Sequence, residues 1–405
     1  MLVELPPELL HSIFDYLDTR TILRLVRPLC TQLLATVKTY NKFKLDCSSS
    51  SIAELRFIAS MVQPEDAISL TLADDDEPEL SRMNLFFSLF QLDRFTRLES
   101  MTLVELNGTP LDQLFQHIIT CPMPLTLLCI TLCRQTLTET ERIIKHLSST
   151  ISQSGIQNLH LNILNGVFIM NTTLQPVQNA LRHLTMNNCK YHTYHILLGR
   201  CANLRTFVLG NCTLENGDQT TLPSFARTSY PQLTSLTLNK CQLSLNELHS
   251  LLSLTPSLVH LKVIIRTLSF ANIANGDLWQ EFIQTKLLFL RQFEFVFTYN
   301  TDPDLYNPAP DSIITSFRTP FWLNDKNWLV VCDYILSPFQ VVLHTLPLHV
   351  SDSDVVIRFD SLSSADCPRL LTGHWLNHMD GVFTEQVSEN VMSLEIVFNV
   401  KIGVR

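Results

Sequence analysis

The stretch Leu233-Thr234-Ser235-Leu236-Thr237-Leu238-Asn239-Lys240-Cys241-Gln242-Leu243 sets the pattern from which the fold of this chain can be inferred. Its apolar residues stand at the first, fourth, sixth and eleventh positions, and a cysteine stands at the ninth. Leu204–Leu214 repeats this template, Leu181–Tyr191 and Leu258–Leu268 follow it closely, and weaker copies begin at Leu98, Leu125, Ile156 and Leu290. Every second residue of the central part is apolar, which predicts a half-buried strand in each copy.

The spacing between copies leaves room for a helix after each strand. Successive starts are 23 to 32 residues apart. The segment Ser244–Leu252 shows what fills the gap, because Ser244 is a suitable N-cap, Glu247 is its capping-box partner, and Leu248, Leu251 and Leu252 share one helical side. Since one such unit cannot bury its own apolar side, the units are expected to stack.

The template resembles leucine-rich repeats, and its cysteines resemble the cysteine-type repeats that often accompany an F-box. The resemblance covers about residues 98 to 300. It implies an α/β fold in which a short N-terminal helical F-box precedes a leucine-rich-repeat solenoid, with parallel strands on the concave face and helices on the convex face. We assign Cys189, Cys212 and Cys241 a structural role where the backbone leaves each strand.

A second informative stretch, Leu5-Pro6-Pro7-Glu8-Leu9-Leu10-His11-Ser12-Ile13-Phe14-Asp15-Tyr16-Leu17, lies at the N-terminus. Two prolines suit a first helical turn, and Glu8 complements the positive end of the helix dipole. Leucine or isoleucine recurs every fourth residue from Leu5 to Leu17, so one side of the helix is strongly apolar. A few short helices of this kind bury too little surface to be stable alone, which favours an external partner.

This stretch resembles the opening of the F-box, Leu-Pro-x-Glu-Leu/Ile-Leu/Ile-x-x-Ile/Val-Phe/Leu-x-Tyr/Phe-Leu, at every position. The later Val-Cys-Arg/Lys-x-aromatic element is only partly present, since Cys30 and Leu33 fit but Arg27-Pro28-Leu29 interrupts it. The resemblance implies binding to the Skp adaptor and, through it, to a cullin-RING ubiquitin ligase. The residues implied in that contact are Leu5, Pro6, Leu9, Ile13, Phe14 and Leu17. The alternative is a helical hairpin that caps the repeats with the same leucines turned inward.

Strand alternation predicts which side chains of the repeats face a partner. With the leucines inward, the residues between them form a polar, nearly uncharged strip. Our candidate substrate-binding residues on it are His160, His183, Thr185, Asn187, Thr237, Asn239, His260 and Lys262. The strip either recognises the target protein, whose identity the sequence does not give, or is only the solvated side of a sheet.

The sequence divides into four parts. We expect an F-box over 1–45, a linker over 46–65 that contains the serine run Ser48–Ser51, the repeats over 66–300, and irregular repeats with a cap over 301–405. The aromatic segment Phe317–Trp328 suits a terminal cap. Residues 391–399 return to the strand template.

Composition excludes several classes of function. The net charge of -9 and the low count of 29 lysines and arginines argue against nucleic-acid and membrane partners. Acidic residues within the N-terminal apolar run exclude a signal peptide, so we expect a cytoplasmic and/or nuclear protein. The odd number of cysteines, 11, favours reduced thiols.

Catalytic motifs were not found. The chain lacks a phosphate-binding Gly-Lys-Ser/Thr loop, a Gly-x-Ser-x-Gly elbow, a His-Glu-x-x-His motif and a Cys-x-x-Cys motif. His192 with His195, and His374 with His378 and Cys367, lack a full ligand set, so we expect no metal and no cofactor. The sequence therefore favours a non-catalytic substrate receptor of an SCF ubiquitin ligase, with a repeat scaffold that acts without a ligase as the alternative.

Overall fold

The computed structural model describes residues 5–73, 82–105, 108–121, 123–132, 142–143, 146–147, 149–151, 154–163, 180–187, 189–213, 229–241, 243–267, 270–300, 310–336, 339–346 and 360–363. The chain forms two compact units, Met1–Thr206 and Phe207–Arg405. The expected strand at 391–399, Cys212's side chain, and the pair His374 and His378 with Cys367 lie outside what is described.

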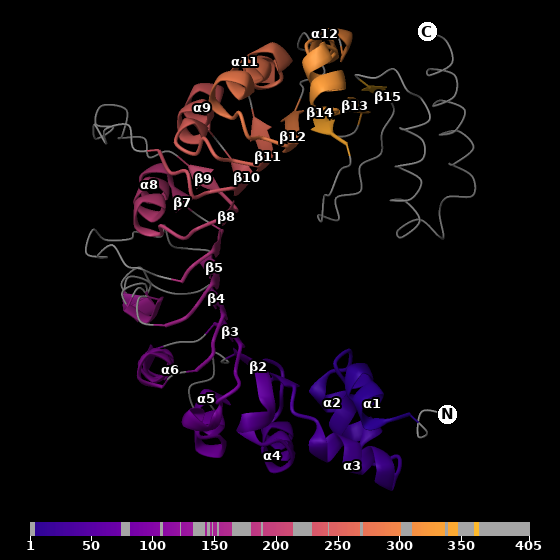
Figure 1. Ribbon diagram of the computed structural model, residues 1–405, viewed down its shortest axis with the longest axis vertical. Helices are drawn as coiled ribbons and strands as arrows, with labels where there is room; N and C mark the ends of the chain where they lie inside the picture. Colours follow the sequence, from indigo (N-terminus) through magenta and orange to yellow (C-terminus); the bar gives the residue numbers. More distant parts are fainter. Residues whose placement is uncertain are drawn as a thin grey trace. The chain divides into compact units, whose positions relative to one another are not determined.

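The first unit begins with a group of short helices, shown in indigo in Figure 1. They are α1 (Pro7–Phe14), α2 (Thr19–Thr21), the π-helical turn η2 (Ile22–Val26) and α3 (Thr31–Thr39). Pro7 occupies the first turn of α1, as expected from its missing N-H group. Asp18 caps α2, because its carboxylate accepts hydrogen bonds from the Thr21 amide (2.8 Å) and hydroxyl (2.5 Å).

Six parallel strands follow in the first unit. In chain order they are β1 (Phe43–Asp46), β2 (Ala67–Ala73), β3 (Ser100–Val104), β4 (Leu127–Leu132), β5 (Asn158–Ile163) and β6 (His183–Met186), and each pairs with the next. The connections contain α4 (Ile52–Met61), η3 (Pro64–Asp66), α5 (Arg82–Leu89), η5 (Leu92–Arg94) and α6 (Gly108–Thr120). A short strand, β7 (Cys189–Lys190), and α8 (Tyr191–Arg200) come after β6. The helices α4, α5 and α6 lie along one side of the strands (Figure 1).

The second unit continues the same strand and helix alternation. Strand β8 (Thr206–Leu209) spans the division between the units, and β9 (Cys212–Thr213), β10 (Ser235–Cys241), α9 (Leu245–Ser253), β11 (His260–Thr267), α10 (Phe270–Ile273), α11 (Gly276–Lys286) and β12 (Gln292–Asn300) follow. Strands β10, β11 and β12 are parallel neighbours. Both hydrogen bonds of the capping box predicted at Ser244 and Glu247 are present at the start of α9.

Strand direction reverses at the end of the second unit. After α12 (Pro310–Thr315) and the π-helical turn η7 (Phe321–Asp325) come β13 (Val330–Leu336), β14 (Phe339–Thr345) and β15 (Asp360–Ser363). Strand β14 pairs antiparallel with both β12 and β13, and β15 pairs antiparallel with β13. The sequence template did not predict this hairpin, because the template describes parallel repeats only.

The strand positions confirm the α/β repeat fold that the template predicts. Each of the eight expected copies contains a strand that begins two residues after its predicted start, from β3 after Leu98 to β12 after Leu290. The template leucines are buried and the residues between them are more open, as in the alternating burial of β4. This alternation fixes the register, because a slip of one residue would turn every leucine toward solvent.

Aromatic residues from α11, β12 and η7 cluster in the second unit. Trp279 of α11 and Trp322 of η7 are both fully buried. Their ring centroids lie 4.9 Å and 6.3 Å from that of Phe293 on β12. Large aromatic side chains contribute strongly to burial, so this cluster closes the core beside the last parallel strand.

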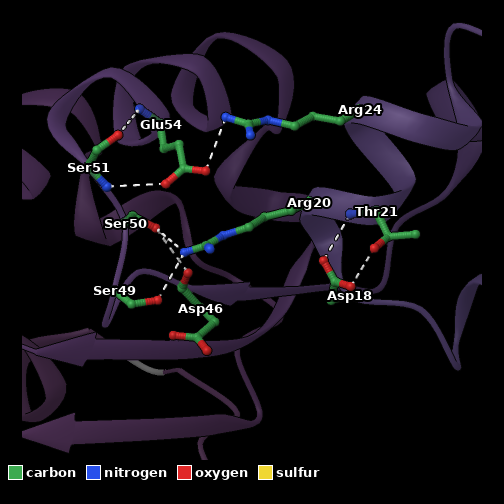
Figure 2. A network of polar contacts seen from close by, with 9 residues as sticks. All are labelled: Asp18, Arg20, Thr21, Arg24, Asp46, Ser49, Ser50, Ser51 and Glu54. Carbon is green, nitrogen blue, oxygen red and sulfur yellow. Dashed lines mark hydrogen bonds and ion pairs between the residues drawn. The ribbon is translucent and has the colours of Figure 1, made fainter.

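The segment after the N-terminal helices differs from the linker that we predicted over 46–65. It contains α4, and Ser50 is fully buried. Arg20 of α2 donates to the hydroxyls of Ser50 (2.9 Å) and Ser49 (3.3 Å), as Figure 2 shows. The serine run is therefore held against the N-terminal helices because its hydroxyls accept from a guanidinium group.

The first turn of α4 adds a second connection to the N-terminal helices. Ser51 and Glu54 form a reciprocal capping box, and the other oxygen of Glu54 lies 3.0 Å from the guanidinium of Arg24 (Figure 2). Glu54 thus serves helix capping and an ion pair at the same time.

Candidate functional site

The N-terminal helix α1 turns one part of its apolar surface inward. Leu10 and Phe14 are 0% and 2% exposed. The Phe14 ring lies edge-on to Tyr40 with centroids 5.5 Å apart. Phe14 belongs to the chain's own core, because it contacts the residue that follows α3, and we remove it from the contact surface that the sequence suggested.

The remaining predicted adaptor-contact residues are more open. Leu9 is 52% exposed, and Pro6 is also exposed. Leu5, Ile13 and Leu17 are half-buried. A leucine that is half open to solvent in a small helical group is available to a partner, so these positions remain candidates.

The structure adds exposed apolar residues that the sequence did not single out. Leu25 and Leu29 are 64% and 71% exposed, and Tyr16 is 92% exposed. Leu25 and Leu29 stand at helical spacing from Ile22 and Leu33 in the sequence, but Ile22 and Leu33 are buried. We call Leu9, Leu25 and Leu29 the exposed leucines of the N-terminal helices.

A polar network holds α1 against the end of α3. The Tyr40 hydroxyl donates to Asp15 (3.0 Å), and Lys42 lies 3.2 Å from the other carboxylate oxygen. Burial raises the pKa of Asp15, but the hydrogen bonds from Tyr40 and Lys42 outweigh it and the pKa lies below its usual range. Burial and the Asp15 carboxylate raise the pKa of Tyr40.

The predicted polar strip exists in the first unit, which brings four of the candidate residues together. His160 on β5 pairs with Thr185 on β6, and Asn158 pairs with His183. Asn187, just after β6, donates a side-chain hydrogen bond to Asn162. Burial lowers the pKa of His160, and the neighbouring His183 lowers it further. We call the face formed by Asn158, His160, Asn162, His183, Thr185 and Asn187 the first polar strip.

The other four candidate residues lie in the second unit. Thr237 on β10 pairs with Lys262 on β11. His260 also lies on β11, and Asn239 is half-buried on β10. Together with Ser235 they form the second polar strip.

The second polar strip carries partners that the sequence did not identify. His260 Nδ1 lies 3.0 Å from Gln292 Oε1, and Lys262 Nζ lies 3.6 Å from Glu294 Oε2. Gln292 and Glu294 are on β12, directly opposite these residues in register. The sequence could have identified both residues, because they stand between the apolar template positions of the repeat that begins at Leu290.

Cysteine, histidine and acidic side chains occur among the described residues, and several of them are buried. Within these parts of the chain, no three His, Cys, Asp or Glu side chains gather in a way that could hold a metal ion. Cys189 and Cys241 are buried, and burial raises the pKa of Cys189 to about 12, in keeping with the structural role proposed for them. The close pair of His344 and Asp333 (2.9 Å) has no exposed surface, so a substrate cannot reach it. None of the described helices combines the length and apolar character needed to span a bilayer.

Part of the chain matches a known protein family. Residues 171–285 match the family model described as "FBD-associated F-box protein At5g56370, LRR repeats". No curated protein matches the chain. The matched segment includes strands β6 to β11 and does not include the N-terminal helices. The match agrees with the strand and helix repeats described above, and residues 171–285 are therefore similar to the leucine-rich repeats of an F-box protein family.

Proposed function

We propose that this chain is the substrate receptor of an SCF-type E3 ubiquitin ligase. In this proposal the N-terminal helices bind the Skp adaptor, and through it a cullin-RING pair, while the repeats bind the target protein. The main support is the exposure of Leu9, Leu25 and Leu29 on helices whose sequence resembles the F-box. Apolar side chains that are more than half open gain free energy when a partner covers them.

The proposed receptor contributes position and no chemical group. Holding a target near the charged conjugating enzyme raises the effective concentration of its lysines, which is enough to accelerate transfer. The two polar strips are the proposed target-binding faces, because their hydroxyl, amide and imidazole groups can donate and accept hydrogen bonds. We place the protein in the cytoplasm and/or the nucleus, where such ligases act.

Co-purification with the Skp adaptor tests the first half of the proposal. The original chain is expected to retain Skp, and Leu9→Asp or Ile13→Asp is expected to lose it, because a carboxylate in an apolar contact is costly to desolvate. Leu288→Asp is the matched control, since Leu288 is exposed but belongs to the second unit. Undiminished capture after both N-terminal changes would favour a repeat scaffold that acts without a ligase.

Target capture from cell lysate tests the second half. Alanine at His160, His183 and His260 is expected to reduce the recovery of natural partners while Skp binding stays unchanged. If the same partners are recovered in the same amounts, the polar strips are only the solvated side of the repeats.

A further inference from the structure

The repeat that contains β12 carries two large apolar side chains on an open turn. Leu288 and Phe289, just after α11, are 69% and 63% exposed. The residues on either side of them, Leu287 and Leu290, are buried, and the Leu290 amide donates to the Leu287 carbonyl (3.0 Å) across the turn. The two buried leucines therefore fix the turn, and the exposed pair occupies its two central positions. We call Leu288 and Phe289 the apolar turn.

Four other repeats show that this turn does not need large apolar residues. The same hydrogen bond closes the turn before Leu98 (3.3 Å), Leu204 (3.0 Å), Leu233 (3.4 Å) and Leu258 (3.2 Å). The central positions of those four turns are small, polar or proline residues: Thr96-Arg97, Ala202-Asn203, Pro231-Gln232 and Pro256-Ser257. Since the fold does not require an exposed apolar pair at this position, a contact with another molecule explains it better.

Positive charge flanks the apolar turn, although the whole chain has a net charge of -9. Lys286 stands two residues before Leu288, and Arg291 two residues after Phe289, so each Cα lies within about 7 Å of that of the nearer apolar residue. Both basic side chains are exposed, and neither forms an ion pair with another described residue. The nearest acid on α11, Glu281, is more than one helical turn before Lys286.

A third cation reaches the same part of the chain from the end of η7. Lys326 Nζ donates to the Leu290 carbonyl (2.8 Å) and lies 5.3 Å from the centroid of the Trp328 ring. The Trp328 indole in turn donates to the Arg291 carbonyl (3.3 Å). Asp325, which precedes Lys326 in the chain, offsets one of the three positive charges, and the surroundings of the apolar turn remain cationic.

We propose that the apolar turn binds a short segment of another protein that combines large apolar side chains with aspartate or glutamate. The apolar side chains of the segment cover Leu288 and Phe289, and its carboxylates pair with Lys286 and Arg291. Apolar burial supplies most of the free energy of this contact, and the charges select a partner of opposite sign. The inference goes beyond the proposed function, because the apolar turn belongs to the second unit and its contact does not involve the N-terminal helices.

A protein segment fits this turn better than a second copy of the chain or a membrane. Two copies that met at the apolar turn would bring like cations together, and their net charges of -9 would repel each other. A single myristoyl chain holds a protein only weakly on a membrane, and one leucine with one phenylalanine buries less apolar surface than that chain does.

Fluorescence anisotropy with the full-length chain tests the inference. The probe is a short labelled peptide that alternates glutamate with leucine or phenylalanine. We expect saturable binding that weakens about tenfold in Leu288→Ala/Phe289→Asn, a double variant that introduces the residue pair of the turn at Ala202-Asn203. A peptide with glutamine in place of glutamate, or with serine in place of leucine and phenylalanine, should bind about tenfold more weakly than the probe.

A second double variant tests the charges without changing the apolar turn. Lys286→Gln/Arg291→Gln should weaken probe binding about fivefold at low salt, and the difference should shrink as salt is raised. Lys240→Gln is the matched control, because Lys240 is an exposed lysine on β10 in the same unit, and it should leave the affinity unchanged. Equal loss in this control, or undiminished binding in either double variant, would overturn the inference.

Two measurements test the other occupants of the turn. Vesicles that contain phosphatidylserine should not sediment the chain, and sedimentation velocity should show no dimer. Vesicle binding that is lost in Leu288→Ala/Phe289→Asn would assign the turn to a membrane, and a dimer that is lost in the same variant would assign it to a second copy. Either result would overturn the inference.

Adaptor binding separates this inference from the proposed function. Both double variants should retain Skp in co-purification, and Leu9→Asp should lose Skp while it keeps its affinity for the probe. Thermal unfolding shows whether each variant keeps its fold. If Leu288→Ala/Phe289→Asn unfolds, the charge variant and the two altered peptides still decide the question, since they leave the apolar turn intact.

Discussion

Truncation of Leu29 to alanine gives a quantitative test of the exposed leucines. The change removes three carbon atoms, which are worth about 2 kcal/mol when they are fully transferred out of water. Since Leu29 is 71% exposed in the free chain, a partner that covers it completely gains about 1.5 kcal/mol from those atoms. Leu29→Ala is therefore expected to weaken Skp binding about tenfold.

Isothermal titration of purified Skp adaptor into the full-length chain measures this loss. Leu288 provides the control, because it is 69% exposed in the turn after α11 and the same substitution removes the same atoms. Leu288→Ala should leave the Skp affinity unchanged. Equal weakening by the two substitutions, or a change of less than about twofold for Leu29→Ala, would refute the assignment of the N-terminal helices as the contact surface.

Three further predictions concern the folded state. Gly276→Ala should lower the free energy of unfolding by about 1–3 kcal/mol in urea titrations, because an added Cβ would lie 2.5 Å from the Ser316 carbonyl oxygen; unchanged stability would contradict this close approach. Burial lowers the pKa of His249 from its ordinary value of 6.5 to about 4. The neutral imidazole therefore contributes fully to the free energy of unfolding above pH 6.5, and this contribution is lost as the pH falls from there toward 4. His249→Phe should remove this part of the pH dependence of stability, and an unaltered profile would argue against it. Burial raises the pKa of the Cys47 thiol to about 12, so little of it is the reactive thiolate at neutral pH. In alkylation followed by mass spectrometry, Cys47 should therefore react more slowly than half-exposed Cys30. Equal rates would show that Cys47 is accessible.

The repeats could be predicted from sequence because burial imposes a period of two on every strand. Even the weak copy at Leu98 gave a strand at the expected offset. Strand β1 was missed, because Phe43-Lys44-Leu45-Asp46 has only two apolar residues and no template around it. The antiparallel strands after β12 were missed because their pairing depends on long-range contacts that no local period encodes.

The candidate surfaces were predicted less completely than the fold. Helical spacing identified an apolar side on α1 but could not separate Leu9, which is open, from Phe14, which is buried against Tyr40. Phe14 is buried because Tyr40, the residue that follows α3, packs against it, and helical spacing in α1 does not show where α3 ends. A run of serines likewise suggests flexibility from composition alone, whereas the guanidinium of Arg20, about thirty residues earlier, holds Ser49 and Ser50 in place.

The antiparallel pairing of β14 with β12 limits how this protein can lengthen in evolution. A parallel repeat added by gene duplication needs a free strand edge on its predecessor, and the edge of β12 that faces away from β11 is occupied by β14. A duplicated repeat inserted directly after β12 would have to displace the hairpin that pairs with this edge. New copies in this unit are therefore accommodated more easily upstream of β12, and comparison of related genes should show length variation there.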